Sequence, residues 1–514
     1  MPSPTSLGLI QDRTFIFQSI RRFPLLFLSA IALIPRLYNL NSPLIGVHAW
    51  RQADTAAMAR NFYEMQLAHP GLKNLWRFLY PQVDWGGGSY AETEFPIYPA
   101  IVSGLYRLLG DHTLYARLLS VLFSLLGLYF LYRLVELCFD RQIAFWSALF
   151  YAILPLSVFY GRTVQPESLV MMSTLGSLYF FKRWTVEECK WDLLKSWGLS
   201  AIALLTKVLP IIYLGFPLLF LAVVKYRGRI FRRVELWMYA IALLAITFAW
   251  YSHAHQIYLD TGVTFGFWPD DTDRYSWANL FRVKYWSDIL FRLLVRHFAI
   301  FGFFIALIGF TYKRTQAANY LWEVGLASSL LANAIAPTSS HVHEYYQLPV
   351  MLYGLVFIGK VYGNAFGYVR CFPWLTIALV LTLITSSLIY SLGYMRPENV
   401  QSSKVYQLAQ QVRSATPADA SVLATTGGDP GLLYLAHRKG WLIHPEEVSP
   451  ERLQAAKEDG ADFLVGSYEI IQSYASFEDE SQKENIRELI AGQTADSCPP
   501  LVNNAQVFIL PICP

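Results

Sequence analysis

A short stretch after the first long apolar run holds residue types that are well suited to chemistry. It reads His48-Ala49-Trp50-Arg51-Gln52-Ala53-Asp54-Thr55. If the stretch is helical, His48, Arg51, Gln52 and Thr55 lie around one face, and Asp54 follows Arg51 by three residues. The pattern would place a carboxylate, which can accept a proton, close to groups that bind anions. A surface Arg51–Asp54 ion pair of little energetic value is the alternative.

Two further carboxylates lie later in the same polar connection, in Tyr90-Ala91-Glu92-Thr93-Glu94-Phe95-Pro96. Acids next to a membrane surface are disfavoured unless they are paired, hydrated or coordinating a ligand. Glu92 and Glu94 are therefore candidates for a site. The alternative for each is a solvated loop charge or an acid at a helix N-terminus.

Charged groups also flank two apolar runs farther along the chain. Arg162 and Glu167 share one connection, and Lys207 ends an apolar run. We regard all three as candidates for ligand binding. Their alternatives are a helix-end charge, a solvated helix cap and a snorkelling lysine, respectively.

A late connection combines His341 and His343 with Tyr345 and Tyr346. The histidine pair is weak evidence for a metal site, because helical ligand pairs are spaced by three or four residues and a further ligand would have to come from another loop. Hydrogen bonding to a phosphate or sugar is the favoured interpretation, and structural packing is the other.

The composition requires a membrane to house these groups. Of the 514 residues, 54% are hydrophobic and only 15% are charged, which excludes a purely soluble enzyme. The net charge is only +4, and there is no basic run interleaved with aromatic residues, which excludes a disordered or nucleic-acid-binding protein. Gly86-Gly87-Gly88 is followed by no Lys-Ser/Thr pair, so it predicts a flexible loop and no nucleotide cradle.

About eleven apolar runs approach the length that a spanning helix needs. Ile97–Leu109 is too short to span, and we expect it to be an interfacial helix, while Arg36 can snorkel at the outer end of the first span. The spans centre on residues 23–40, 117–136, 143–160, 168–184, 196–206, 208–225, 235–252, 289–311, 317–336, 346–361 and 373–394.

Lysine and arginine cluster in connections that should be cytoplasmic. All the clusters fall on one side if the N-terminus is inside, as in a bacterial inner membrane protein. The loops 41–95, 161–167, 253–288 and 337–345 then lie outside. The clusters comprise residues 13, 21 and 22; 182, 183, 190 and 195; 225, 227, 229, 232 and 233; and 313 and 314.

The composition changes near Met395. The last stretch, from Leu392, contains about 16 acidic and about 9 basic residues, whereas the chain before it is apolar and basic. We expect a membrane domain over 1–394 and a soluble extracytoplasmic α/β domain over 395–514. Its helices are predicted at 402–415, 431–438 and 450–458, and its strands at 421–425, 441–444, 462–466 and 506–511. Cys498 and Cys513 can form a disulfide there.

These features resemble the GT-C class of polyprenol-phosphate-sugar glycosyltransferases, family 39-type, which includes protein O-mannosyltransferases and the aminoarabinose transferase of lipid A. The layout matches over about 390 residues. The matching features are an acid after the first span, an acid before Phe95-Pro96, Leu108-Leu109-Gly110-Asp111, Arg117-Leu118-Leu119-Ser120, Gly161-Arg162-Thr163-Val164-Gln165-Pro166-Glu167, Thr206-Lys207 and His343-Glu344-Tyr345-Tyr346-Gln347-Leu348-Pro349.

The resemblance implies that Asp54 is the general base and that Glu94 orients the acceptor or a divalent metal. Phe95 stands where the aminoarabinose transferases have lysine, so Lys207, Arg51 or Arg162 must face the donor phosphate. The other substrate-binding candidates are His48, Gln52, Glu92, Glu167, His343, Tyr345 and Tyr346.

The expected function is transfer of a sugar from a polyprenyl-phosphate carrier to a lipid, glycan or protein acceptor at the outer face, with inversion at the anomeric carbon. No nucleic-acid partner is expected, and a metal cofactor is left open. A non-catalytic transporter or flippase of lipid-linked glycans is the alternative. It would require polar residues along several mid-membrane faces, whereas the acids here gather in outer loops.

Overall fold

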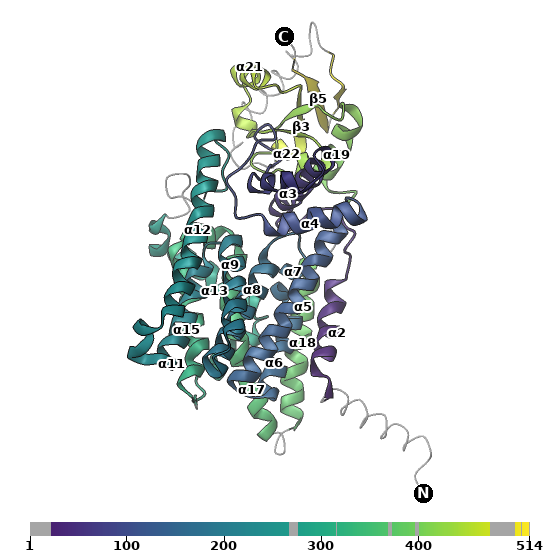
Figure 1. Ribbon diagram of the computed structural model, residues 1–514. Helices are drawn as coiled ribbons and strands as arrows, with labels where there is room; N and C mark the ends of the chain where they lie inside the picture. The colour runs from purple at the N-terminus through teal and green to yellow at the C-terminus, as the bar shows by residue number, and fades with distance from the viewer. Residues whose placement is uncertain are drawn as a thin grey trace. The chain divides into compact units, whose positions relative to one another are not determined.

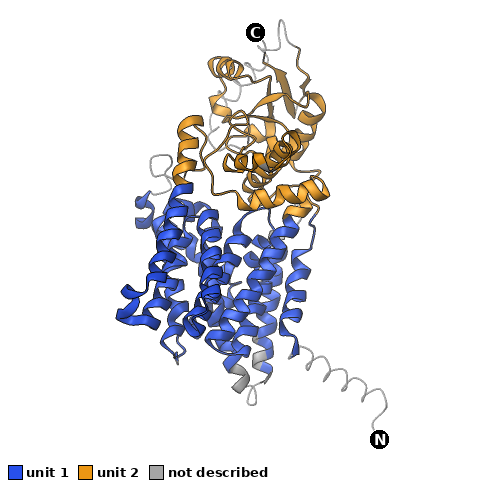
Figure 2. Ribbon diagram, viewed as in Figure 1, with its two compact units in different colours: residues 1–40, 117–250, 268–395 blue, residues 41–116, 251–267, 396–514 orange. Residues whose placement is uncertain are grey.

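The computed structural model describes residues 22–266, 276–314, 316–368, 373–395, 400–472, 499–504 and 506–512. Its chain folds into two compact units, which Figure 2 shows in different colours. Unit 1 comprises residues 1–40, 117–250 and 268–395, and unit 2 comprises 41–116, 251–267 and 396–514. The connections 41–116 and 251–267 thus belong to the same unit as the C-terminal residues, although the composition changes only near Met395.

Unit 1 is helical (Figure 1). Helix α8 packs against α9, and α6 packs against α17. Prolines explain several interruptions: Pro155 opens α7 and keeps Leu154 extended, which divides the apolar run 143–160. The helices are α2 (Pro24–Arg36), α5 (Thr113–Cys138), α6 (Arg141–Ile153), α7 (Pro155–Tyr160), α8 (Glu167–Glu187), α9 (Lys190–Thr206), α10 (Pro210–Tyr213), α11 (Gly215–Tyr226), α12 (Val234–Thr261), α13 (Val283–Phe291), α14 (Phe301–Phe310), α15 (Leu321–Ile335), α16 (Pro337–Val342), α17 (Leu348–Tyr368) and α18 (Pro373–Met395). The first residues of α5, 113–116, and the last of α12, 251–261, are counted with unit 2.

Within the described ranges, three helical segments are long and apolar enough to cross a membrane. They are Thr113–Cys138, Pro210–Arg232 and Val234–Thr261, and a pair bent by 101°, Val283–His297 with Phe301–Phe310, is a fourth if it counts as one span. The chain is a polytopic membrane protein, and the number of eleven spans remains a prediction.

Arg36 does not snorkel, so that expectation is wrong. It is fully buried at the last turn of α2. Its guanidinium donates to the carbonyl oxygens of Ala152 and Ser157 at 2.8 and 3.0 Å, and to Ser124 Oγ at 2.9 Å. A buried guanidinium is tolerated because its donors are satisfied, and here it joins α2 to α5, α6 and α7.

Unit 2 contains three helices from its first segment and a mixed sheet from its last. The predicted helix Ile97–Leu109 is confirmed as α4, with α3 (Ala49–Ala68) and the 3-10 helix η1 (Leu72–Leu79) before it. The C-terminal elements are α19 (Lys404–Ala415), β1 (Ser421–Ala424), α20 (Gly431–Ala436), β2 (Lys439–Leu442), α21 (Pro450–Glu458), β3 (Phe463–Ser467), α22 (Tyr468–Gln472), β4 (Val502–Asn503) and β5 (Val507–Pro511).

The sheet has the strand order β2-β1-β3-β5-β4. β1 lies between β2 and β3 and is parallel to both, whereas β5 is antiparallel to β3 and β4. The α/β alternation predicted from the sequence accounts for the parallel part, because parallel neighbours need a crossover. Cys498 and Cys513 lie outside the described residues, as do Cys371, Arg13 and Arg21.

Candidate active site

Helix α3 positions the first group of candidate residues and is enclosed by protein over most of its length. It begins directly after His48, whose backbone is left-handed with a φ of 53°. The helical form that was considered for this stretch is thus the one observed. Residues 51–62 are all buried, although they include several polar side chains. Buried polar groups need partners inside the protein. The partners of the polar side chains on α3 therefore show which residues surround this candidate site.

Asp54 is the most unusual acid of this group. It is 3% exposed, and its Oδ1 accepts a hydrogen bond from Trp85 Nε1 at 3.0 Å. Burial raises the pKa of Asp54 from 3.8 to about 7, while the charge of Arg51 and the bond from Trp85 oppose that rise. A carboxyl with a pKa near neutrality is suited to exchange protons at physiological pH.

Arg51 makes its salt bridge with Glu94 and not with Asp54, so the proposed surface pair is wrong. The Nη2 atom of Arg51 lies 2.8 Å from Oε1 and 2.9 Å from Oε2 of Glu94. Its guanidinium also lies 5.1 Å from the centre of the Phe265 ring. Arg51 is 5% exposed, which makes the pair a largely buried one.

Glu92 is fully buried between the first segment of unit 2 and residues 251–267. Its carboxylate accepts a hydrogen bond from the Thr264 hydroxyl and lies 3.5 Å from Nδ1 of His255. Its backbone pairs with Val263 and Phe265. Gln52 donates from Nε2 to the Val47 carbonyl oxygen at 3.2 Å, close to the start of α3.

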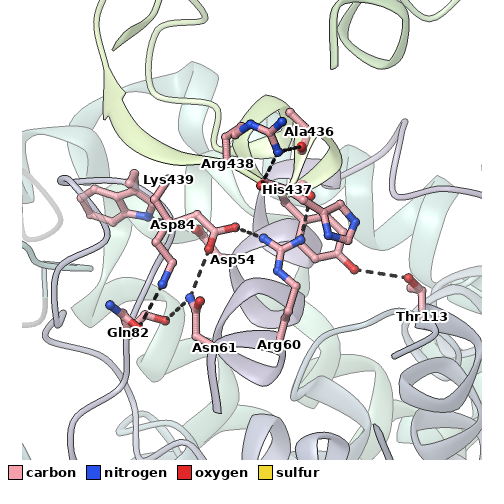
Figure 3. A network of polar contacts seen from close by, with 12 residues as sticks. Asp54, Arg60, Asn61, Gln82, Asp84, Thr113, Ala436, His437, Arg438 and Lys439 are labelled. Atoms are coloured by element: carbon pink, nitrogen blue, oxygen red, sulfur yellow. Dashed lines mark hydrogen bonds and ion pairs between the residues drawn. The ribbon is translucent and has the colours of Figure 1, made fainter. Parts of the chain in front are cut away.

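A polar network beside Asp54 was missed in the sequence, and Figure 3 shows it. Arg60 of α3 forms a buried ion pair with Asp84 and donates to the Tyr434 carbonyl oxygen at 2.9 Å. Its guanidinium lies 4.7 Å from the centre of the Tyr434 ring. Asn61 donates to Asp84 Oδ1 at 3.1 Å. The residues of this network lie far apart in sequence, so no local pattern predicts their contacts. The polar side chains of α3 were the one signal in the sequence that could have indicated the network.

The second group of candidates lies in unit 1. Lys207, at the end of α9, forms an ion pair with Glu167, at the start of α8. The Lys207 Nζ lies 4.3 Å from the centre of the Tyr345 ring and 5.6 Å from that of Tyr346. The structure therefore brings these four predicted residues together.

Around them lie Glu344, which was named from the sequence only as part of a motif, and its neighbours. Glu344 is buried and forms an ion pair with Arg296 at 2.6 Å. The Tyr160 hydroxyl donates to Glu344 Oε1 at 3.4 Å. The His343 ring stacks on Tyr345 with a centroid distance of 5.1 Å, and its role in binding stays a prediction.

Arg162 and His341 each have a separate neighbour. Arg162 donates to the Asn39 carbonyl oxygen at 3.1 Å, and His341 Nε2 lies 3.5 Å from Asp288 Oδ2. Among the residues that the structure describes, no three His, Cys, Asp or Glu side chains are grouped to hold a metal ion. Within the described part of the chain, His341 and His343 therefore lack the further ligand that a metal site would need.

Residues 93–253 match the family model described as dolichyl-phosphate-mannose-protein mannosyltransferase. No curated protein matches the sequence of this chain.

Several solved structures share the fold. A crystal structure of ArnT from Cupriavidus metallidurans bound to undecaprenyl phosphate aligns with a TM-score of 0.61 at 13% identity, covering 95% of this chain and 98% of that one. The oligosaccharyltransferase AglB from Archaeoglobus fulgidus, in complex with an inhibitory peptide and a dolichol-phosphate, aligns with a TM-score of 0.56 at 13% identity over 88% of this chain and 70% of its own.

The arabinofuranosyltransferase AftD from Mycobacteria gives a TM-score of 0.55 at 14% identity, covering 96% of this chain and 41% of its own. At these identities the structural matches establish the fold, and the family model adds the enzyme class. Together they confirm the resemblance found in the sequence motifs, which is to membrane glycosyltransferases of the GT-C class.

Proposed function

We propose that this glycosyltransferase moves a sugar from a polyprenyl-phosphate donor to a lipid, glycan or protein acceptor at the outer face of a bacterial inner membrane. The observation that carries the proposal is the buried Asp54 carboxyl, which has a pKa of about 7 and lies beside the Arg51–Glu94 pair. The polyprenyl part of the proposal draws on ArnT, whose structure holds undecaprenyl phosphate.

In the proposed reaction, Asp54 removes the proton from the acceptor hydroxyl or amine while that atom attacks the anomeric carbon. The bond from the anomeric carbon to the phosphate oxygen breaks, and polyprenyl phosphate leaves with the electron pair. A single displacement of this kind inverts the anomeric centre. Trp85 donates to Oδ1 of Asp54, and the other carboxylate oxygen takes the proton.

The leaving phosphate gains negative charge and requires cationic donors held in place. We assign this role to Lys207. Its ammonium has three donors and retains capacity beside the pair with Glu167. Oε2 of Glu167 is buried and accepts no hydrogen bond within the described residues, so it is our candidate to accept a hydroxyl of the donor sugar. His48, Gln52, Glu92, Arg162, His343, Tyr345 and Tyr346 remain substrate-binding candidates.

The domain from 395 to 514 is proposed to be extracytoplasmic, with a cytoplasmic N-terminus and about eleven spans. This orientation follows from the lysine- and arginine-rich connections. It places the acids of residues 41–95 on the side where a lipid-linked donor would present its sugar.

The experiment compares wild type, Asp54→Asn and the exposed control Asp459→Asn as purified full chains in nanodiscs. Lipids that co-purify are identified by mass spectrometry. Release of undecaprenyl phosphate from a panel of undecaprenyl-phosphate sugars is then measured with lipid, glycan and peptide acceptors. We expect Asp54→Asn to retain the bound lipid and to lose roughly 10²–10⁴-fold in transfer, while the control is unchanged.

Near-normal transfer by Asp54→Asn would remove the assigned base. Movement of intact lipid-linked sugar across the bilayer, without release of undecaprenyl phosphate by wild type, would favour a flippase.

A further inference from the structure

The loop of residues 82–88 in unit 2 pairs with strand β2 of the C-terminal segment. Gly87 N donates to the Gly440 carbonyl oxygen at 2.8 Å, and Gly440 N donates to the Asp84 carbonyl oxygen at 2.9 Å. Lys439 Nζ donates to Gln82 Oε1 at 3.3 Å (Figure 3). The loop is thus attached to β2 by backbone and side-chain bonds.

The three consecutive glycines of this loop fit closely against their neighbours. Gly86, Gly87 and Gly88 have φ values of 61°, 71° and 77°, which L side chains rarely adopt. A Cβ on Gly87 would lie 2.7 Å from the Trp441 ring, and one on Gly88 would lie 2.6 Å from Lys439 Cδ. The segment expected to be a flexible loop is therefore a fitted contact with β2.

The same loop carries a hydrogen-bond donor to the Asp54 carboxylate, because Trp85 directly precedes the glycines and its Nε1 donates to Oδ1. Trp85 also meets the Phe265 ring edge-on, with a centroid distance of 5.9 Å. From the other side, Arg60 and Asn61 of α3 hold the side chain of Asp84. The loop is thus fixed between β2 and the helix that bears Asp54.

We propose that β2 is a positioning element of the active site, which clamps the 82–88 loop and so holds Trp85 against Asp54. This gives the C-terminal domain a part in the chemistry, although none of its residues is assigned as catalytic. The proposal rests on the proposed role of Asp54 and specifies Trp85 as its positioning residue.

The indole donates to the charged form of Asp54, so its loss should disfavour ionisation. In Trp85→Phe, which keeps an aromatic ring but no donor, the titration midpoint of Asp54 should move upward by about one pH unit, a tenfold change in the ionisation equilibrium. Gly87→Ala, which forces the loop away from Trp441, should move the midpoint in the same direction. Gly460→Ala, which also lies at a positive φ (97°) in the same domain but meets no atom within 4 Å, is the matched control.

The midpoint is measured without substrate, by infrared difference spectroscopy on the full-length protein in nanodiscs. The carboxylic acid band that disappears in Asp54→Asn reports the protonation of Asp54. Trp85→Phe and Gly87→Ala should shift that band's midpoint upward, and Gly460→Ala should leave it at the wild-type value.

An unchanged midpoint in Trp85→Phe would overturn the positioning role, and an unchanged midpoint in folded Gly87→Ala would overturn the clamp. If Gly87→Ala does not fold, Lys439→Met tests the clamp by removing the bond to Gln82. Failure of the proposed transfer reaction is seen separately, because the infrared titration needs no donor or acceptor.

Discussion

Arg51 and Glu94 form a two-point contact in which one guanidinium nitrogen serves both carboxylate oxygens, at 2.8 and 2.9 Å. The pair joins α3 to the residues just before α4, across 43 positions of sequence. The pair neutralises the charge of Arg51, as Glu167 neutralises that of Lys207, so pairing alone does not rank these two residues as candidates for the donor phosphate. The first consequence of the Arg51–Glu94 pair concerns the stability of the protein.

Breaking the Arg51–Glu94 pair from one side should destabilise the protein strongly. Arg51→Met leaves a largely buried carboxylate without its partner, which typically costs about 3–5 kcal/mol. Arg51→Met combined with Glu94→Leu removes both charges and should be less harmful than Arg51→Met alone. Unfolding midpoints of the purified full chain measure this. Equal loss in the single and double variants would contradict a coupled pair.

Transfer should rise with pH through about 7, because only ionised Asp54 can accept a proton. At pH 6, kcat/KM should be about tenfold below its plateau. The free energy of unfolding should change with pH in the opposite direction. Folding raises the pKa of Asp54, so the native state holds the proton more firmly and stability falls as pH rises from about 4 to about 7.

Asp54→Asn should therefore unfold at a higher temperature than wild type at pH 8, and the two should converge near pH 4. Thermal unfolding of both proteins at pH 4 and pH 8 checks this dependence of stability on pH. A midpoint difference that is the same at pH 4 and pH 8 would show that the carboxyl does not titrate between them.

Lys207→Met should lower transfer by at least about tenfold, equivalent to about 1.4 kcal/mol of transition-state stabilisation. Lys207→Arg should restore part of the rate, because charge returns with altered geometry. Since Glu167 is 2% exposed, its unpaired charge could itself disturb the protein. Because Glu167 is itself a proposed ligand of the donor sugar, Glu167→Gln is measured alone beside the double variant with Lys207→Met. The double variant should be clearly slower than Glu167→Gln alone if Lys207 serves the phosphate.

The proposed topology would make residues 395–514 accessible from outside. Protease added to intact spheroplasts should cleave this domain, and a cytoplasmic marker protein should survive as the control. Full protection of the domain would reverse the proposed orientation, including that of residues 41–95.

Local patterns were predictable from the sequence, and long-range partners were not. The helix from 450 to 458 and the strand near 462–466 were found because their signals lie within a few residues. The two-residue strand β4 has too little pattern to be detected. Arg51 was matched with its neighbour Asp54, whereas its partner Glu94 is brought close only by folding.

The same limit applies to the site. Asp54 was identified through a family resemblance, but its raised pKa depends on burial that the sequence does not specify. Trp85 and Arg60 were missed because their roles arise from contacts with distant segments. Prolines did mark the interruptions of the helices, yet the apolar run 143–160 still suggested one continuous span.

The contact between Arg60 and Tyr434 joins residues 374 positions apart, so it sets an order of events during biosynthesis. Ribosomes add about 5–20 residues per second, and Tyr434 therefore emerges roughly 20–75 s after Arg60. During that interval helix α3 has been made, but the strand that clamps the neighbouring loop does not yet exist. A nascent or prematurely terminated chain consequently carries Asp54 without its completed surroundings. If β2 has the proposed positioning role, competence for sugar transfer arrives only with the last quarter of the polypeptide.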